Sequence, residues 1–197
     1  MSDIWAIILA AGESKRMGSA KMLLPFRGVT IIEKVIENVA ASDVGKSLIV
    51  LGCYKDQILK VIGKYPVIHC FNAYYKHGML SSVRCGVASL PDDFSAVLVF
   101  PGDMPVIEAP LINLVIKAYR DTARGIIIPA YMGRRGHPIL IDRKYRDEIM
   151  SLDDTAGLRA LAVNHTDDLL VIGTDNPLIL KDIDTEEDYK NELNQTI

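Results

Sequence analysis

The 197-residue sequence contains no hydrophobic run long enough to cross a membrane, and it carries no excess of positive charge. The apolar run near its start is too short for a signal peptide or a membrane span, lacks a preceding basic region and ends in charged residues. A formal net charge of −3 argues against general binding to nucleic acids or to anionic membrane surfaces. The sequence therefore predicts a cytoplasmic protein that binds neither nucleic acid nor membrane.

Cysteine is scarce, and the three that are present are Cys53, Cys70 and Cys85. Their number is odd and no two of them have the C-x-x-C spacing, so neither a disulfide framework nor a zinc site is expected. We interpret all three as free thiols that are buried or partly buried.

The rest of the composition is that of an ordinary globular protein, with 49% hydrophobic and 24% charged residues. A length of 197 residues fits one domain, and no repeat, low-complexity segment or linker divides the chain. We therefore treat residues 1–197 as a single domain.

Short apolar runs alternate with amphipathic stretches along the whole sequence. Strands are expected at residues 5–10, 47–51, 67–70, 96–100, 126–129 and 169–172, and helices at residues 31–41, 56–63, 82–90, 111–122 and 158–163. Thr30 and Glu33 form a candidate capping box for the first long helix. The alternation predicts an α/β fold with a mostly parallel, doubly wound sheet. Residues 133–136 are expected to form a hairpin-like antiparallel excursion from that sheet.

The loop after the first expected strand combines small residues with cations. Ala11 and Gly12 allow the backbone to approach a ligand closely, and Arg16 and Lys21 supply the positive charge that a triphosphate needs. The loop has neither the Gly-x-x-x-x-Gly-Lys-Ser/Thr nor the Gly-x-Gly-x-x-Gly spacing. An ordinary strand-to-helix turn with solvated charges is the alternative interpretation of this stretch.

A single carboxylate follows the apolar strand at residues 96–100. Two prolines flank Gly102 and Asp103, which stiffens the turn and fixes the direction of the carboxylate at the sheet edge. Such a carboxylate suits Mg²⁺, which takes one or two protein carboxylates together with phosphate oxygens and water. A turn-capping aspartate is the alternative.

A second carboxylate lies near the end of the chain. Thr185 is expected to cap a helix, and the acids at 186–188 are explained by their favourable interaction with its dipole. Asp184 precedes the cap on an extended segment and has no such structural explanation. We expect it at the same sheet edge as Asp103, where the two carboxylates and a phosphate chain would complete a Mg²⁺ site.

Five motifs in order resemble the nucleotidyltransferase family of molybdenum-cofactor dinucleotide synthases, and most closely its cytidylyl-transferring members. They are Leu9-Ala10-Ala11-Gly12-x-Ser14-x-Arg16-Met17-Gly18-x-x-Lys21, Gly78-Met79-x-Ser81-Ser82-Val83-Arg84-x-Gly86, Pro101-Gly102-Asp103-Met104-Pro105, Gly136-His137-Pro138-Ile139-Leu140 and Asp182-Ile183-Asp184-Thr185-x-Glu187-Asp188-Tyr189. The motifs extend over nearly the whole chain.

The resemblance implies a three-layer α/β/α fold that joins a nucleoside triphosphate to a phosphorylated acceptor and releases pyrophosphate with the help of Mg²⁺. It divides the domain into a nucleotide-binding part, residues 1–105, and an acceptor-binding part, residues 106–197. Arg16, Lys21 and Asp103 are the implied catalytic residues, and Asp103 and Asp184 the implied metal ligands. The implied nucleotide-binding residues are Leu9, Ala10, Ala11, Gly12, Arg16, Lys21, Ser81, Ser82, Pro101, Gly102 and Asp103.

The implied acceptor-binding residues are Gly136, His137 and Pro138, although a lone histidine can equally be structural. Ser81 and Ser82 are expected both to cap a helix and to face the nucleotide. The chain departs from the family at Ala20, where relatives often have proline. A departure at residues 153–159 leaves Asp154 and Arg159 as possible acceptor contacts only.

Guanylyl-transferring relatives tend to have Gly-Gly where this chain has Ala10-Ala11, so the resemblance favours CTP over GTP. The implied acceptor is molybdopterin, and a molybdoenzyme is a possible client. Two alternatives remain. The chain could instead deliver molybdenum cofactor to a hydroxylase with little transferase activity, or transfer nucleotides to another phosphorylated acceptor. The motif residues Arg16, Lys21, Asp103 and Asp184 argue against loss of the activity.

Overall fold

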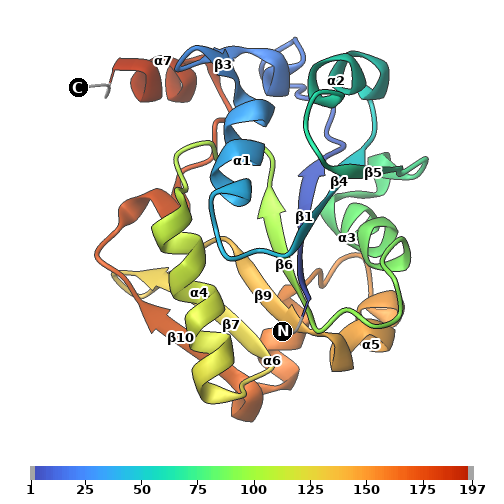
Figure 1. Ribbon diagram of the computed structural model, residues 1–197, viewed down its shortest axis with the longest axis vertical. Coiled ribbons are helices and arrows are strands. Elements are labelled where there is room, and N and C mark those ends of the chain that lie inside the picture. The colour runs from blue at the N-terminus through green and yellow to red at the C-terminus, as the bar shows by residue number, and fades with distance from the viewer. Residues whose placement is uncertain (1–2, 195–197) are drawn as a thin grey trace.

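The centre of the computed structural model, which describes residues 3–194, is an eight-stranded mixed sheet (Figure 1). Its strands are β1 Ile4–Ala10, β4 Lys46–Leu51, β5 Ile68–Phe71, β6 Ala96–Pro101, β7 Ile126–Tyr131, β8 Arg134–Arg135, β9 Ile139–Asp142 and β10 Leu169–Gly173. A separate two-stranded sheet pairs β2 Pro25–Phe26 with β3 Val29–Thr30.

Most of the helices connect these strands along the chain, and α7 follows the last strand. The α-helices are α1 Ile31–Ala40, α2 Lys55–Ile62, α3 Met79–Ala88, α4 Ala109–Thr122, α5 Arg146–Ser151, α6 Arg159–Asn164 and α7 Glu186–Asn194. The 3₁₀ helices are η1 Lys21–Leu23, η2 Tyr75–His77, η3 Arg143–Tyr145, η4 Thr166–Asp168 and η5 Pro177–Leu180. No helix within residues 3–194 has the length and apolarity that a membrane span requires.

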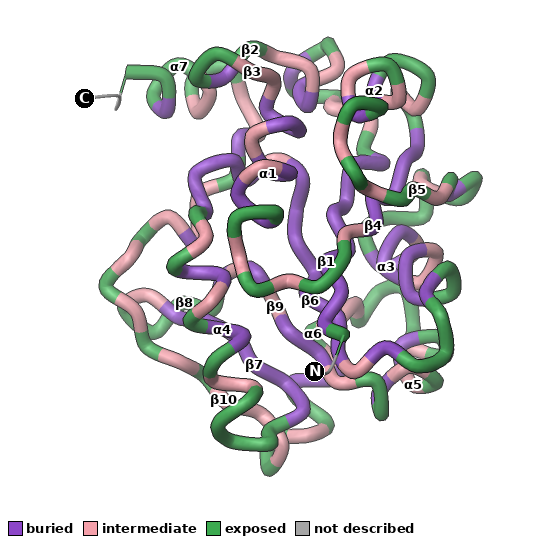
Figure 2. Tube along the Cα trace, in the orientation of Figure 1, coloured by how far each residue is buried: buried purple, intermediate pink, exposed green. Residues whose placement is uncertain are grey.

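Two hydrophobic clusters, one on each face of the sheet, produce the three-layer arrangement. Side chains alternate along a strand, so Ala6 and Ile8 of β1 pack with α1, α2 and α4, whereas Ile7 and Leu9 pack with α3, α5 and α6. Every residue of β1 is buried (Figure 2), as expected for a strand covered on both faces. The α/β/α fold predicted from the sequence is confirmed.

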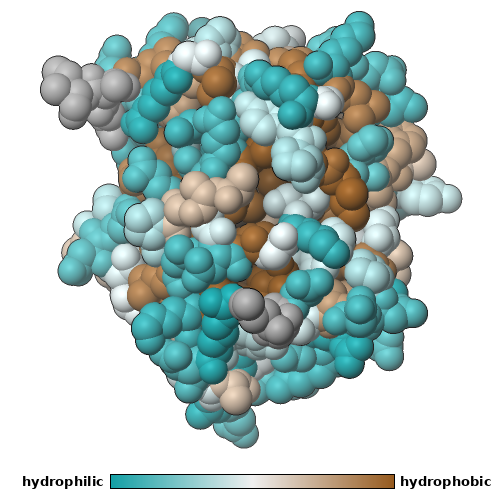
Figure 3. Space-filling model, in the orientation of Figure 1, coloured by the Kyte–Doolittle hydropathy of each residue, from teal (hydrophilic) through white to brown (hydrophobic). Residues whose placement is uncertain are grey.

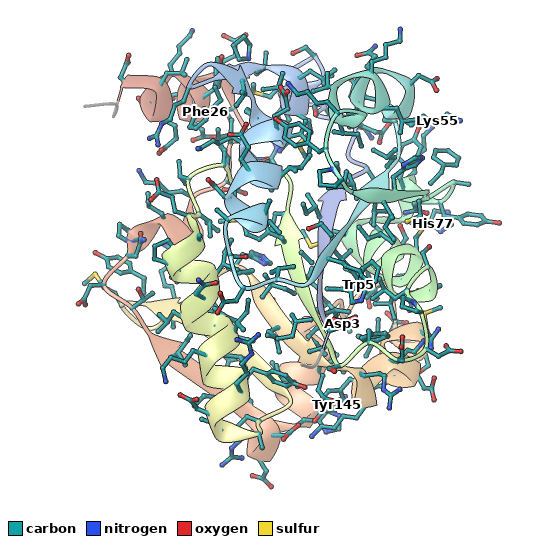
Figure 4. All side chains as sticks on the ribbon, viewed as in Figure 1. Asp3, Trp5, Phe26, Lys55, His77 and Tyr145 are labelled. Atoms are coloured by element: carbon teal, nitrogen blue, oxygen red, sulfur yellow. The ribbon has the colours of Figure 1, made fainter. Side chains whose placement is uncertain are left out.

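Residues from distant parts of the chain complete the two clusters. Phe26, beside α1 in Figure 4, is fully buried in the first cluster. Trp5 and Tyr145, in the lower half of the same view, belong to the second. On the outer face seen in Figure 3, hydrophilic residues cover much of the surface around smaller hydrophobic areas.

The sheet order β10-β7-β9-β6-β1-β4-β5 reverses direction at β1. From β1 the chain continues outward to β4 and β5, and then returns to place β6 on the other side of β1. β1, β4, β5 and β6 are parallel, and β1 and β6 point toward the end of the molecule where α7 lies (Figure 1). In sheets of this type, ligands bind outside the carboxyl ends of the strands at the reversal.

The expected antiparallel excursion is present, but it includes more of the sheet than the sequence indicated. β8 pairs antiparallel with β7, and β9 lies antiparallel between β6 and β7.

Two helices differ from the prediction. The helix α5 was not predicted from the sequence. The helix expected at residues 82–90 begins three residues earlier, at Met79, and its N-cap is Gly78 without a side-chain hydrogen bond. Ser81 and Ser82 therefore lie inside the first turn of α3 and do not cap it.

The predicted capping box at the start of α1 is confirmed. The Thr30 amide donates to Glu33 Oε2 at 2.8 Å, and the Glu33 amide donates to Thr30 Oγ1 at 3.4 Å. Glu33 is buried and also pairs with Lys64, whose Nζ lies 2.6 Å from Oε1. Burial alone would raise the pKa of Glu33, but hydrogen bonds from Lys64 and Thr30 outweigh it and lower the pKa to about 2.

This depressed pKa gives a pH-dependent contribution to stability. The contribution is complete above the ordinary glutamate pKa of 4.5 and is lost as the pH falls toward about 2. We expect Glu33→Gln to lower the free energy of unfolding at neutral pH by about 2 kcal/mol, because a charged hydrogen-bonded group is lost. Denaturant unfolding should show the difference between wild type and variant shrinking below pH 4.5. The exposed Glu186→Gln is the control, and a difference that persists undiminished into acid contradicts this assignment.

Candidate functional site

A cleft of about 660 Å³ lies at the carboxyl ends of β1 and β6. Its lining comes from the loop after β1 with η1, from η2 and the start of α3, from the turn after β6, from β8 and its connection to β9, and from the stretch from η5 to Asp184. Both parts into which the sequence motifs divide the domain contribute to this lining. The cleft therefore occupies the place where the reversal of strand order predicts a ligand site.

The loop after β1 is a compact turn. The amides of Met17 and Gly18 both donate to the Ser14 carbonyl, at 3.0 and 3.1 Å. Ser14 and Gly18 have positive φ angles of 50° and 63°, which tighten the turn. The buried Met17 and a hydrogen bond from the Tyr54 hydroxyl to the Glu13 carbonyl hold the loop against the domain.

Four charged side chains converge in the cleft. Lys21 Nζ lies 2.6 Å from Asp103 Oδ2 and 2.8 Å from Asp184 Oδ1. Arg16 Nη1 lies 2.8 Å from the other oxygen of Asp184. The tertiary structure thus brings together all four residues for which the sequence predicted phosphate or metal binding. We call this set the charged cluster.

Burial and charge oppose each other at Lys21. The residue is only 7% exposed, and burial alone would lower its pKa. The carboxylates of Asp103 and Asp184 outweigh burial and raise the pKa of Lys21 above its ordinary value. Burial likewise would raise the pKa of Asp184, but Lys21 and Arg16 lower it. Lys21 and Asp184 are therefore both ionised at neutral pH.

Backbone contacts fix the two aspartates. The Gly102 amide donates to the Leu9 carbonyl at 3.0 Å, and a Cβ at Gly102 would lie 2.7 Å from that oxygen. Only glycine permits this approach of the β6 turn to β1, which sets the position of Asp103. The Ile183 amide donates to the Asp103 carbonyl at 3.0 Å and so brings the segment that carries Asp184 alongside the turn.

The helix α7 fixes the far side of Asp184. Thr185 and Asp188 form reciprocal hydrogen bonds of 2.8 Å and 3.1 Å between side chain and backbone, as in a capping box. The sequence expectation that Thr185 caps this helix is confirmed, and Asp188 has the structural role that its position suggested.

The other predicted nucleotide-binding residues divide into two groups. Those that line the cleft are Leu9, Ala11, Gly12, Ser82 and Pro101. Ala10 does not line it, because its side chain points to the opposite face of β1 and packs in the first hydrophobic cluster. Ser81 and Gly102 also lie outside the lining.

Asn72 is a residue at the site that sequence reasoning missed. It is 2% exposed, and its Nδ2 donates to Ser81 Oγ at 2.9 Å and to Ser82 Oγ at 3.0 Å. Its Oδ1 accepts from the Tyr74 amide. Asn72 therefore ties the end of β5 to the first turn of α3, where Ser82 faces the cleft. The only sequence signal for a role of Asn72 at the site was its position directly after β5.

The predicted acceptor residues lie on the opposite wall. A Cβ at Gly136 would approach the Ile179 carbonyl to 2.3 Å, so Gly136 is required for close packing against η5. The His137 amide donates to the same carbonyl at 3.0 Å, whereas its buried Nδ1 has no partner within residues 3–194. Burial lowers the pKa of His137, and the charge of Asp103 opposes this only in part. Pro138 is buried behind the wall and does not line the cleft.

Five further charged residues line the cleft and were not predicted as site residues: Glu13, Lys15, Asp182, Arg134 and Arg135. For Asp182 a signal was present, because residues i and i+2 of an extended segment share a face and the intervening Ile183 is buried. Asp154 forms an ion pair with Arg84 at 2.6 Å, and neither Asp154 nor Arg159 lines the cleft.

The residues of the charged cluster fit a hard cation that is shared with a phosphate chain. Within residues 3–194 no group of three His, Cys, Asp or Glu side chains could hold a metal by itself. Asp103 and Asp184 nevertheless supply carboxylate oxygens in one place, and Asp103 Oδ1 is buried without a hydrogen-bond partner. Two protein carboxylates are what Mg²⁺ takes when phosphates complete its coordination.

The fold and this cleft define a nucleotide-binding α/β protein whose charged groups suit a nucleoside triphosphate. The MobA-like NTP transferase domain matches residues 6–169, and the chain belongs to that family of nucleotidyltransferases. The chain is 30% identical to the molybdenum cofactor cytidylyltransferase of Escherichia coli, over 96% of this chain and 95% of the relative. It is also 30% identical to a probable molybdenum cofactor guanylyltransferase of Natranaerobius thermophilus, over 66% of this chain and 62% of that relative.

Solved structures show the same fold at lower identity. Rv0371c from Mycobacterium tuberculosis superposes with a TM-score of 0.86 at 21% identity, over 98% of this chain and 99% of that chain. A second structure of that protein is a complex with manganese and superposes with a TM-score of 0.84 at 20% identity, over 99% of this chain and 100% of that chain. The three-layer nucleotidyltransferase fold expected from the motifs is confirmed.

Of the two cations in the charged cluster, Lys21 is the buried one and contacts both aspartates, so its substitution is expected to have the larger effect on activity. We expect Lys21→Ala to reduce kcat/KM for the nucleotide by a factor equivalent to about 1.5–3 kcal/mol, because the predicted phosphate-binding residue loses its charge and its hydrogen bonds. Initial rates of pyrophosphate release measure this change. Lys117→Ala, on the outer face of α4, removes the same charge from an exposed site and is the control. Normal turnover by Lys21→Ala would mean that Lys21 does not bind the phosphates.

Proposed function

We propose that this chain is a Mg²⁺-dependent cytidylyltransferase. It transfers CMP from CTP to the phosphate of a molybdopterin-type acceptor, the molybdenum cofactor, and releases pyrophosphate. The observation that carries the proposal is the charged cluster, in which Lys21 and Arg16 are paired with Asp103 and Asp184 at the carboxyl ends of β1 and β6. The similarity to the molybdenum cofactor cytidylyltransferase of Escherichia coli supports the choice of acceptor.

The charge balance of the cluster supports a metal ion. Two cations and two carboxylates neutralise one another, so the cluster by itself has no positive charge left for a triphosphate. Lys21 and Arg16 can turn to the phosphates only if Asp103 and Asp184 gain another cation. These two aspartates would hold the ion, and when bound it would neutralise charge on the phosphates. Mg²⁺ prefers such oxygen ligands.

The transfer needs no protein nucleophile. An oxygen of the acceptor phosphate attacks the α-phosphorus of CTP, a new P–O bond forms, and the bond to the β-phosphate breaks with its electron pair leaving on pyrophosphate. Lys21 and Arg16 bind the phosphates and keep the leaving group in line. Their contribution is positioning and neutralisation of negative charge, which are the main requirements of phosphoryl-type transfer.

The wall that carries Gly136 and His137, with Pro138 buried behind it, is the proposed acceptor side. Because burial lowers the pKa of His137, its imidazole is neutral at physiological pH. The neutral ring of His137 lines the cleft and would face the acceptor there. The product would pass to a molybdoenzyme that uses the dinucleotide form of the cofactor.

The metal assignment predicts the effect of removing either carboxylate. We expect Asp103→Asn and Asp184→Asn each to reduce Mg²⁺-dependent turnover by about 100-fold or more, because the amide keeps the shape but not the charge that a hard cation needs. The double variant should lose much less than the sum of the two effects, because both residues hold one ion. Pyrophosphate release over a range of Mg²⁺ concentrations measures this dependence.

The matched control is Glu187→Gln, which removes an exposed carboxylate from the first turn of α7. It should leave turnover unchanged. A complex with nucleotide and Mg²⁺ in which the ion contacts neither Asp103 nor Asp184 would refute the assignment, whatever the kinetics.

The base preference rests on the Ala10-Ala11 pair. Ala11 lines the cleft and packs closely against Gly52, whereas Ala10 is buried on the other face of β1. We therefore expect wild type to prefer CTP over GTP and Ala11→Gly to narrow that preference, while Ala10→Gly changes it less. Rates with each nucleoside triphosphate, with and without molybdenum cofactor, provide the test. Equal use of CTP and GTP by wild type would leave only the broader transferase assignment.

A further inference from the structure

We propose that Arg134 and Arg135 form a second anion site in the cleft, which binds the phosphate monoester of the acceptor. The inference rests on the proposed function, because it assigns the chemistry by which the same cleft recognises the acceptor. Both arginines come from β8, and both line the cleft together with Gly136 and His137. They are exposed, although the cleft lining includes part of each residue.

The two arginines differ from the other cations of the cleft in having no acidic partner. Arg16 and Lys21 are paired with aspartates, and Lys15 is paired with Glu13. Within residues 3–194, no ion pair or side-chain hydrogen bond engages the guanidinium of Arg134 or Arg135. A guanidinium presents a planar set of donors that matches the geometry of a phosphate. Two such groups that line one cleft, with their charge uncompensated, suit a dianionic ligand.

The backbone holds this pair in a defined position. The β7–β8 hairpin pairs Tyr131 with Arg134, and its two central residues, Met132 and Gly133, have φ angles of 48° and 77°. Positive φ at both positions is typical of the tight two-residue turns that fit twisted strands. Beyond β8, the Gly136 amide donates to the Pro129 carbonyl at 2.8 Å. The hairpin is therefore anchored on both sides of the arginines.

Electrostatics explains why the acceptor needs such a site. Asp103, Asp182 and Asp184 all line the same cleft, and a bound triphosphate adds further negative charge. A second phosphate entering this cleft is repelled unless cations meet it. Arg134 and Arg135 supply two positive charges on the wall that also carries His137. The cleft then has one set of cations for each of the two phosphorylated substrates.

The first test uses phenyl phosphate, a simple aromatic phosphate monoester, as the probe. Its affinity for the intact protein is measured by titration calorimetry without nucleotide. We expect the Arg134→Ala/Arg135→Ala double variant to weaken binding at least tenfold and Arg124→Ala to leave it unchanged. Arg124 is an exposed arginine just before the opposite end of β7, and it controls for the loss of surface charge.

Binding that is unaffected in the double variant overturns the inference. So does binding that is lost in Lys21→Ala while it persists in the double variant, because the phosphate would then occupy the charged cluster. Unchanged thermal unfolding of each variant excludes loss of fold as the cause. This binding test needs no transferase activity, so its result on the anion site holds even if the proposed function is wrong.

The second test is kinetic and uses molybdenum cofactor as the acceptor at saturating CTP and Mg²⁺. We expect the double variant to raise the KM for the acceptor at least tenfold, with the KM for CTP changed less than twofold. Arg134→Lys/Arg135→Lys should give an intermediate KM, because charge is kept but the planar donor set is lost. Equal effects on both KM values, or none on the acceptor, overturn the inference. Absence of acceptor-dependent turnover in wild type refutes the proposed function instead.

Discussion

The buried ammonium of Lys21, held between two carboxylates, is the interaction on which the arrangement of the cleft depends. It joins three segments that are far apart in the sequence: the loop after β1, the turn after β6 and the stretch before α7. Each partner is partly shielded from water, so removal of any one leaves an uncompensated charge. The same interaction holds the site together without ligand and supplies the charges on which the proposed binding of nucleotide and metal depends.

The position of this interaction depends on places where the backbones of two segments approach each other closely. Glycine is required where the β6 turn meets β1, at Gly102, and where the β8–β9 connection meets η5, at Gly136. At both positions a side chain would collide with a carbonyl oxygen of the neighbouring segment. The walls of the cleft are therefore set by main-chain packing, and the functional side chains project from segments with little freedom to move.

Local patterns were sufficient for much of the fold and for part of the site. Thr30 and Glu33 reveal the start of α1, because a capping box involves residues only three positions apart. Asp103 stands at the end of an apolar run, so its place at the carboxyl edge follows from the strand itself. The start of α3 did not follow, since Gly78 begins this helix without a side-chain cap. Asn72 was missed because its partners belong to another element.

The sequence alone determined the alternation of strands and helices, the chemical types of the residues proposed to bind phosphate and metal, and the family to which they point. These features depend on hydrophobic periodicity and short motifs, which are local along the chain. Only the tertiary structure decided that Lys21 contacts both Asp103 and Asp184, that Ala11 faces the cleft while Ala10 does not, and that the β8 arginines share this cleft. These facts depend on strand order and on contacts between distant segments, which no local pattern encodes.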